Sequence, residues 1–246
     1  VAGVKIVSTV ADQKDMVYVT GATGTKAANE TNGVQLTLEH ALSQIQISAK
    51  SDNAVYTYQV KGIRISNVDG EADFNVVNGT WSNNAANDQI YEVKYATPVT
   101  LNGTAQSIME RKQDNGTDYS DNAMLLPQGA TTAWDVDADQ TNTNKGTYIS
   151  VLLRITKGAD NVFPAEGTET YGWAAVPVSF TWNKGNKYVY TLDFTNGAGR
   201  VDPVDPGTDV DPGNKDPDKG DKILGDPIKF TVTVTPWNPQ ENNIGM

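Results

Sequence analysis

The residue types that could carry out chemistry are few and scattered along the chain. His40 is the only histidine, and cysteine is absent. A lone imidazole without a nearby serine or second histidine forms neither a catalytic pair nor a histidine metal cluster. The lack of cysteine also rules out disulfides and thiolate chemistry. We therefore expect His40 to be a hydrogen-bonded structural residue at a bulge in its strand.

The carboxylates also give no specific catalytic or metal-binding pattern. Asp135, Asp137 and Asp139 imitate the start of a calcium loop, but Gln140 stands where glycine is needed and Gly146 where an acidic residue is needed. With 30 acidic residues, chance carboxylate pairs are unavoidable, so they do not indicate a glycosidase. Phosphate-binding glycine loops and a nucleophile elbow are missing. We predict no enzyme activity, no cofactor and no metal.

Three tryptophans leave two interpretations open. Trp81, Trp134 and Trp173 could form an exposed platform that stacks on sugars, or they could fill the core of a β-sandwich. Core packing is the commoner role for aromatic side chains in sandwiches.

Charge and hydropathy exclude other classes of partner. The formal net charge is −11, which repels phosphate backbones, so nucleic-acid binding is not expected. No stretch approaches the roughly 18 apolar residues that would span a bilayer.

The elements that must position these residues are nearly all strands. Thr, Val, Tyr and Ile dominate the periodic segments, and Asn-Gly pairs that favour tight turns recur between them. No convincing amphipathic helix longer than two turns is present. The pattern predicts an all-β, antiparallel sandwich. The predicted strands are Val4–Val10, Met16–Thr20, Val34–Lys50, Tyr56–Asn67, Asp73–Val77, Ile90–Tyr95, Ala123–Leu126, Thr147–Thr156, Ala174–Trp182 and Lys187–Phe194.

Two predicted strands change register partway along. The apolar alternation of Val34–Lys50 shifts at His40 and Ala41, and that of Tyr56–Asn67 shifts at Gly62. A shift of one residue with a nearby glycine predicts a β-bulge.

The composition changes after residue 199. Five Asp-Pro dipeptides begin within residues 200–226, the last at Asp226, and the segment has no periodic apolar pattern. We expect this segment to be an extended tether that repels itself and could reach roughly 80 Å. Its marker residues are Asp202, Pro203, Asp205, Pro206, Asp211, Pro212, Asp216 and Pro217.

A well-formed strand follows the predicted tether. In Asp226–Pro239, DPIKFTVTVTPWNP, apolar and polar residues alternate, Pro236 ends the pairing and Trp237 follows as a large anchor. A lone strand cannot satisfy its own backbone, so it must pair with a sheet of its own domain or of a neighbour. The residues expected to enter that sheet are Ile228, Phe230, Val232, Val234 and Trp237.

Six segments together resemble the fimbrillins of Bacteroides-type bacteria, the FimA-type or type V pilins and their relatives. The order and spacing of these motifs carry the resemblance. The segments are DQKDMVYVTG (Asp12–Gly21), VQLTLEHALSQIQIS (Val34–Ser48), GTW (Gly79–Trp81), MLLPQ (Met124–Gln128), WNKGNKYVYTLDF (Trp182–Phe194) and DPIKFTVTVTPW (Asp226–Trp237).

The resemblance implies transthyretin-like β-sandwich domains, export to the cell surface through the outer membrane, and polymerisation by strand exchange. On this basis residues 1–33 are the end of an N-terminal pilin domain that is mostly missing, or added edge strands. Residues 34–199 are the C-terminal sandwich, 200–226 the tether and 227–246 the C-terminal strand for exchange. The implied partners are other copies of the chain or related pilins, joined head to tail, together with host or bacterial surface ligands.

Two functions remain open from the sequence. The chain is either a structural pilus subunit with a role in adhesion, polymerised by inserting residues 227–237 into a neighbour, or a monomeric surface adhesin or glycan-binding sandwich. In the second case the terminal strand pairs within its own chain.

Overall fold

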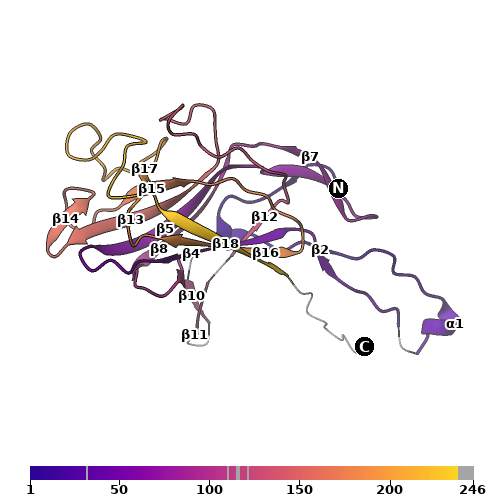
Figure 1. The fold of residues 1–246 in the computed structure, drawn as a ribbon. Coiled ribbons are helices and arrows are strands. Elements are labelled where there is room, and N and C mark those ends of the chain that lie inside the picture. Colours follow the sequence, from indigo (N-terminus) through magenta and orange to yellow (C-terminus); the bar gives the residue numbers. More distant parts are fainter. Residues whose placement is uncertain (32, 110, 115–116, 121, 238–246) are drawn as a thin grey trace.

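The computed structural model describes residues 1–246 except 32, 110, 115–116, 121 and 238–246. Two sheets face each other across one main hydrophobic core (Figure 1). The described helices are only η1 (Val10–Asp12) and α1 (Lys26–Asn29). The prediction of an all-β sandwich is confirmed, and no helix in the described part of the chain is long and apolar enough to cross a membrane.

Sheet I runs in the order β12-β4-β16-β18, with β9 also paired to β4. Its strands are antiparallel except for the parallel pair β4 and β16. Their bounds are β4 (Ser43–Lys50), β9 (Gln106–Ser107), β12 (Ala123–Leu125), β16 (Asn186–Asp193) and β18 (Lys229–Pro236).

Sheet II runs in the order β17-β15-β13-β5-β8, with β14 also paired to β13. All its pairs are antiparallel. Their bounds are β5 (Thr57–Val68), β8 (Gln89–Thr100), β13 (Tyr148–Lys157), β14 (Asp160–Phe163), β15 (Gly172–Pro177) and β17 (Arg200–Val201).

Three smaller sheets lie outside this pair. β1 (Val4–Lys5), β6 (Glu71–Asn75) and β7 (Thr80–Ala85) form one, β2 (Val17–Tyr18) and β3 (Glu39–His40) the second, and β10 (Arg111–Asp114) and β11 (Thr117–Ser120) the third. Residues 1–20 thus contribute short strands that pair with β6 and β3.

The alternation in the sequence explains how the core is filled. In β16, Tyr188, Tyr190 and Leu192 are buried while the residues between them are partly exposed. The two faces of a strand alternate, so one face of each sheet supplies the core. The predicted bulge at Gly62 is confirmed, since the register between β5 and β8 shifts between Val60 and Gly62.

The prediction of a continuous strand over Val34–Lys50 is wrong for its first part. Residues 34–38 carry strand-type alternation but have no ladder partner among the described residues, and regular pairing starts only at β3 and β4. The predicted bulge at His40 and Ala41 is instead an interruption between two strands in different sheets.

Candidate strand-exchange site

β18 is the last strand of sheet I and pairs with β16 of its own chain. The register joins eight residue pairs, from Lys229 opposite Asp193 to Pro236 opposite Asn186. Just beyond Pro236, the Trp237 backbone N–H donates to the Gly185 carbonyl at 2.7 Å. The predicted terminal strand therefore exists, and in this structure it completes the sheet of its own domain.

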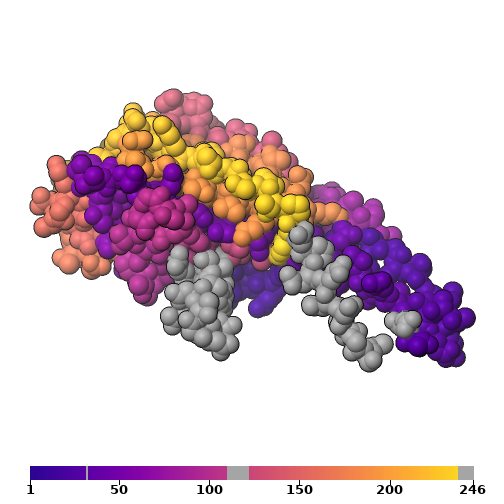
Figure 2. All heavy atoms as spheres, turned by 60° about the horizontal axis from the view of Figure 1, so that its bottom comes forward, coloured from indigo at the N-terminus to yellow at the C-terminus, as the bar shows by residue number. Residues whose placement is uncertain are grey.

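The apolar face of β18 is only half covered. Phe230, Val232 and Val234 stand opposite Leu192, Tyr190 and Tyr188, and directly paired residues point to the same side of a sheet. Although those β16 residues are buried, the three β18 side chains are 38%, 43% and 51% exposed. Figure 2 shows β18, in yellow, running along the surface of the body. We name Phe230, Val232 and Val234 the β18 ladder.

The residue before β18 is anchored much more firmly. Ile228 is 4% exposed and belongs to the main core. It packs closely over Gly199, where an added Cβ would lie 2.8 Å from the Ile228 Cδ1 atom. Of the five residues predicted to enter a partner sheet, Ile228 is therefore the one held in the core of its own domain.

The far end of β18 is held by an aromatic stack. The rings of Trp237 and His40 lie 3.6 Å apart with an interplanar angle of 5°. The His40 Nδ1 atom is in turn 2.7 Å from the Asp15 Oδ2 atom. The prediction of a hydrogen-bonded structural histidine is confirmed. The sequence carried no signal that Asp15, His40 and Trp237 would meet, because they lie far apart along the chain.

The prediction of an extended tether over residues 200–226 is wrong. β17 adds to β15 of sheet II, and Asp202, Pro203 and Pro206 are buried. The Trp173 N–H donates to the Pro206 carbonyl at 2.9 Å. Aspartate side chains here accept hydrogen bonds from nearby backbone N–H groups, so the Asp-Pro repeats specify turns instead of a repelling coil.

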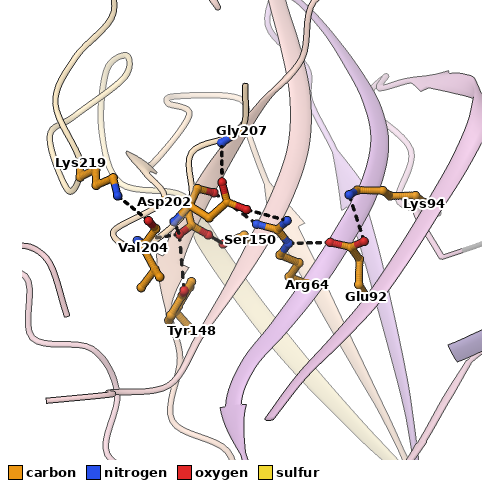
Figure 3. Close-up of polar contacts among 10 residues, drawn as sticks. Arg64, Glu92, Lys94, Tyr148, Ser150, Asp202, Val204, Gly207 and Lys219 are labelled. Atoms are coloured by element: carbon orange, nitrogen blue, oxygen red, sulfur yellow. Dashed lines mark hydrogen bonds and ion pairs between the residues drawn. The ribbon is translucent and has the colours of Figure 1, made fainter. Parts of the chain in front are cut away.

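Asp202 is the centre of the first of these turns (Figure 3). Its carboxylate accepts hydrogen bonds from the Ser150 hydroxyl at 2.6 Å and from the Val204 and Asp205 backbone N–H groups at 2.9 Å each. The Tyr148 hydroxyl is 3.4 Å away. Burial raises the pKa of Asp202 above its ordinary value, although the hydrogen bonds act to lower it.

Arg64 ties the same loop to sheet II. Its guanidinium bonds Asp205 at 3.1 Å and Glu92 at 2.7 Å, and it lies 3.9 Å above the ring of Trp173. Burial alone would raise the pKa of Glu92, but the hydrogen bonds and charges of Arg64 and Lys94 outweigh it, and this pKa is lowered. One guanidinium therefore links the loop, through Asp205, to β8, through Glu92.

The second half of the segment is fixed by Asp216. Its two carboxylate oxygens accept from the Ala165 N–H at 2.8 Å and from the Asp211 N–H at 3.0 Å. Pro217 is half-buried and Pro212 is exposed. Residues 200–226 thus lie along the body.

The prediction of an exposed sugar-binding platform is wrong for Trp134 and Trp173, which are buried. Trp134 and Trp173 are each 2% exposed, and Trp81 is half-buried with its Nε1–H bonded to the Ala41 carbonyl at 2.6 Å. The alternative core role is confirmed for Trp134 and Trp173.

The three calcium-loop-like aspartates make local turns. Asp135 accepts the Asp137 and Ala138 N–H groups at 3.2 Å each, and Asp139 accepts the Asn144 N–H at 2.7 Å. Among the described residues, no group of three His, Cys, Asp or Glu side chains is placed to hold a metal ion.

Comparison with known proteins places this fold in one family. A family model described as fimbrillin-like matches residues 3–237. Two solved structures from Parabacteroides distasonis, provisionally described as cell adhesion proteins, are similar to this chain. One is 12% identical, with a TM-score of 0.40 over 84% of this chain and 55% of that chain. The other is 14% identical, with a TM-score of 0.41 over 89% of this chain and 65% of that chain.

A third structure, from Bacteroides uniformis and described in the same way, is 15% identical, with a TM-score of 0.36 over 93% of this chain and 68% of that chain. This chain spans about half the length of the first structure, at 55%. No curated protein matches it. The match of the family model over almost the whole chain shows that this protein belongs to the fimbrillin-like family.

Proposed function

We propose that the protein is a structural subunit of a bacterial surface fimbria with a role in adhesion, and that residues 227–237 insert into a neighbouring subunit to polymerise it. Membership of the fimbrillin-like family supports the fimbrial and cell-surface role. The observation that carries the strand-exchange step is the position of β18, which is fully paired along one edge while all eight of its residues are exposed.

The energetics of exchange follow from this half-covered position. A neighbouring groove with walls on both sides would keep the backbone hydrogen bonds of the strand and bury its ladder completely. Fully burying a valine or phenylalanine side chain is worth about 1.5–3 kcal/mol, and roughly half of that area is still exposed on β18. Exchange would therefore bury the β18 ladder and keep its hydrogen bonds, and the acceptor groove must also replace the core contacts that Ile228 makes in its own domain.

The packed segment 200–226 limits how far the donor strand can reach. If Asp226 stays in place, the 11 residues Pro227–Trp237 span at most about 35–40 Å. The acceptor groove must then lie on a directly adjacent subunit. A head-to-tail contact of this kind does not close on itself, so it builds filaments.

A disulfide that locks β18 onto β16 tests the exchange step. Val189 and Thr233 stand opposite each other, and the chain has no cysteine of its own. We expect the oxidised Val189→Cys/Thr233→Cys variant to form far fewer filaments by electron microscopy than the reduced variant. Oxidised protein that polymerises as well as reduced protein would overturn the exchange step.

Truncation provides a second measurement. A chain that lacks Pro227–Met246 should elute as a monomer from a sizing column under conditions where the intact chain forms oligomers. The two single-cysteine variants, kept reduced, are the controls for the substitutions themselves.

The second candidate is a monomeric surface adhesin. It is favoured by the complete pairing of β18 with β16 in the same chain. In that case the locked and unlocked proteins should both remain monomeric, and both should bind a cell-surface ligand with equal affinity.

A further inference from the structure

An arm formed by residues 19–31 and 33–38 projects from the body. Figure 1 shows it reaching away from the sheets, with α1 near its tip. Strand pairing is confined to its base, where Val17 stands opposite His40 and Tyr18 opposite Glu39. The returning limb, residues 34–38, has no ladder partner among the described residues.

The returning limb carries a row of exposed apolar side chains. Val34, Leu36 and Leu38 are 42%, 59% and 42% exposed, and the polar residues Gln35 and Thr37 alternate with them. We name Val34, Leu36 and Leu38 the arm ladder. A segment with this alternation is suited to half-buried strand pairing. Its exposure marks it as an interaction surface.

β18 has a free edge that is suited to such a segment. It ends the strand order of sheet I in the described structure, so half of its backbone groups face outward. Natural edge strands are usually guarded by charges or proline, but here Lys229 and Pro236 stand only at the two ends. The six residues between them, Phe230–Thr235, are uncharged.

The two ladders match in spacing and charge. An antiparallel register that sets Leu38 opposite Phe230 also sets Leu36 opposite Val232 and Val34 opposite Val234. The next position then places Glu39 opposite Lys229, which are opposite charges. Cross-strand apolar pairs and opposite-charge pairs both stabilise a sheet.

We infer that residues 34–38 of one copy add as a strand to the outer edge of β18 in a second copy. Sheet I then continues from one subunit into the next, and each ladder covers the other. The contact joins two different surfaces, so a pair of copies keeps one free arm and one free edge for further copies. It leaves β18 paired with its own β16, so it is separate from strand exchange.

The experiment therefore uses the oxidised Val189→Cys/Thr233→Cys protein, in which exchange is blocked. We expect this protein to self-associate in sedimentation velocity runs over a range of concentrations. Leu36→Asp should weaken the association at least tenfold, because it buries a charge in the contact. The matched control, Thr37→Asp, changes the same limb on its polar side and should retain association within about threefold.

A mixing experiment identifies the second surface. Val232→Asp changes the β18 ladder and should also weaken self-association at least tenfold. A mixture of Leu36→Asp and Val232→Asp proteins should form a heterodimer, because the intact arm of the second fits the intact edge of the first. Thermal melting of each variant verifies that it is folded.

Three results would overturn the inference. The first is a locked protein that stays monomeric at every concentration, and the second is a Leu36→Asp protein that associates like the unsubstituted one. The third is a mixture that fails to associate. A loss with Val232→Asp alone would show that two β18 edges pair with each other instead. Strand exchange is judged separately, by comparing the oxidised and reduced proteins.

Discussion

At the scale of single residues, Asp202 shows how a buried carboxylate can organise a loop. It accepts two backbone N–H groups and the Ser150 hydroxyl, which would otherwise lose their partners on burial. The same burial raises its pKa, so its charged form costs stability. The loop is therefore held by hydrogen bonds and opposed by desolvation.

This balance predicts a distinct pH dependence for Asp202. A raised folded-state pKa contributes stability that is present below the unfolded pKa of about 3.9 and is lost as the pH rises through the folded value. Asp202→Asn keeps an acceptor oxygen and cannot titrate. We expect its stability relative to the unsubstituted protein to increase as the pH rises through that range, measured by denaturant unfolding at several pH values.

The control is Asp202→Ala, which removes the acceptor as well as the charge. It should destabilise the protein by about 1–3 kcal/mol at pH 7, because two backbone N–H groups are left unpaired. If the unfolding free energies of the Asp202→Asn and unsubstituted proteins run parallel with pH, the carboxylate does not titrate differently on folding.

The stack of Trp237 on His40 leads to a second prediction. Replacing either residue with alanine should expose β18 amides to faster hydrogen exchange, while global stability changes little. The effects of the two substitutions on the opening free energy of β18, measured by hydrogen exchange, should not be additive. The coupling energy should be about 0.5–1.5 kcal/mol, as is typical of aromatic pairs. Thr235→Ala, at the same end of β18, is the control. Additive effects would mean that the rings do not interact in solution.

At the scale of elements, the strands that fill the core could be predicted from the sequence. The alternation in Lys187–Phe194 and Thr147–Thr156 identified β16 and β13 closely, because burial of one face leaves a period of two. The same period misled at residues 34–38. Alternation reports suitability for a sheet, and it does not say whether a partner strand is available within the chain.

The prediction of an extended tether over residues 200–226 was wrong for a different physical reason. Its composition matches that of a linker whose like charges repel. However, the carboxylates of Asp202 and Asp216 accept hydrogen bonds from backbone N–H groups that turns bring close. Such contacts depend on where each aspartate falls in a turn, which composition does not record. The strand at β18 was identified by alternation, whereas its pairing with β16 needed the structure.

Gly199 provides a prediction about how β18 begins. Its φ is +72°, and an added Cβ would lie 2.6 Å from the Ala175 carbonyl oxygen and 2.8 Å from Ile228 Cδ1. Gly199→Ala should therefore destabilise the fold and loosen the start of β18. The control is Gly158→Ala, because Gly158 has a φ of +60° with nothing within 4 Å of the added Cβ.

The two alanine variants share the backbone strain of a positive φ, about 1–2 kcal/mol. Overpacking against the Ala175 carbonyl and Ile228 should add roughly 1–3 kcal/mol for Gly199→Ala alone, measured by denaturant unfolding. Equal losses for the two variants would show that both Ala175 and Ile228 move aside freely, and that the packing around Gly199 is looser than the burial of Ile228 suggests.

At the scale of the whole molecule, each copy carries a formal net charge of −11. Head-to-tail assembly brings these like charges together, whichever surfaces make the contact. Charges separated by more than a Debye length are screened, and that length falls from about 30 Å at 0.01 M salt to about 10 Å at 0.1 M. The proposed ion pair between Lys229 and Glu39 is screened too, but it is a single pair.

Repulsion between whole subunits should therefore decide how assembly depends on salt. We expect filaments to appear at lower protein concentration as sodium chloride rises from about 0.01 M to 0.2 M, measured by light scattering and electron microscopy. Sucrose at matched osmolality is the control for exclusion of solute from the protein surface, which favours association without changing the ionic strength. Assembly that weakens with salt would mean that attraction between a few opposite charges at the contact outweighs the net charge, and Lys229→Glu should then abolish it.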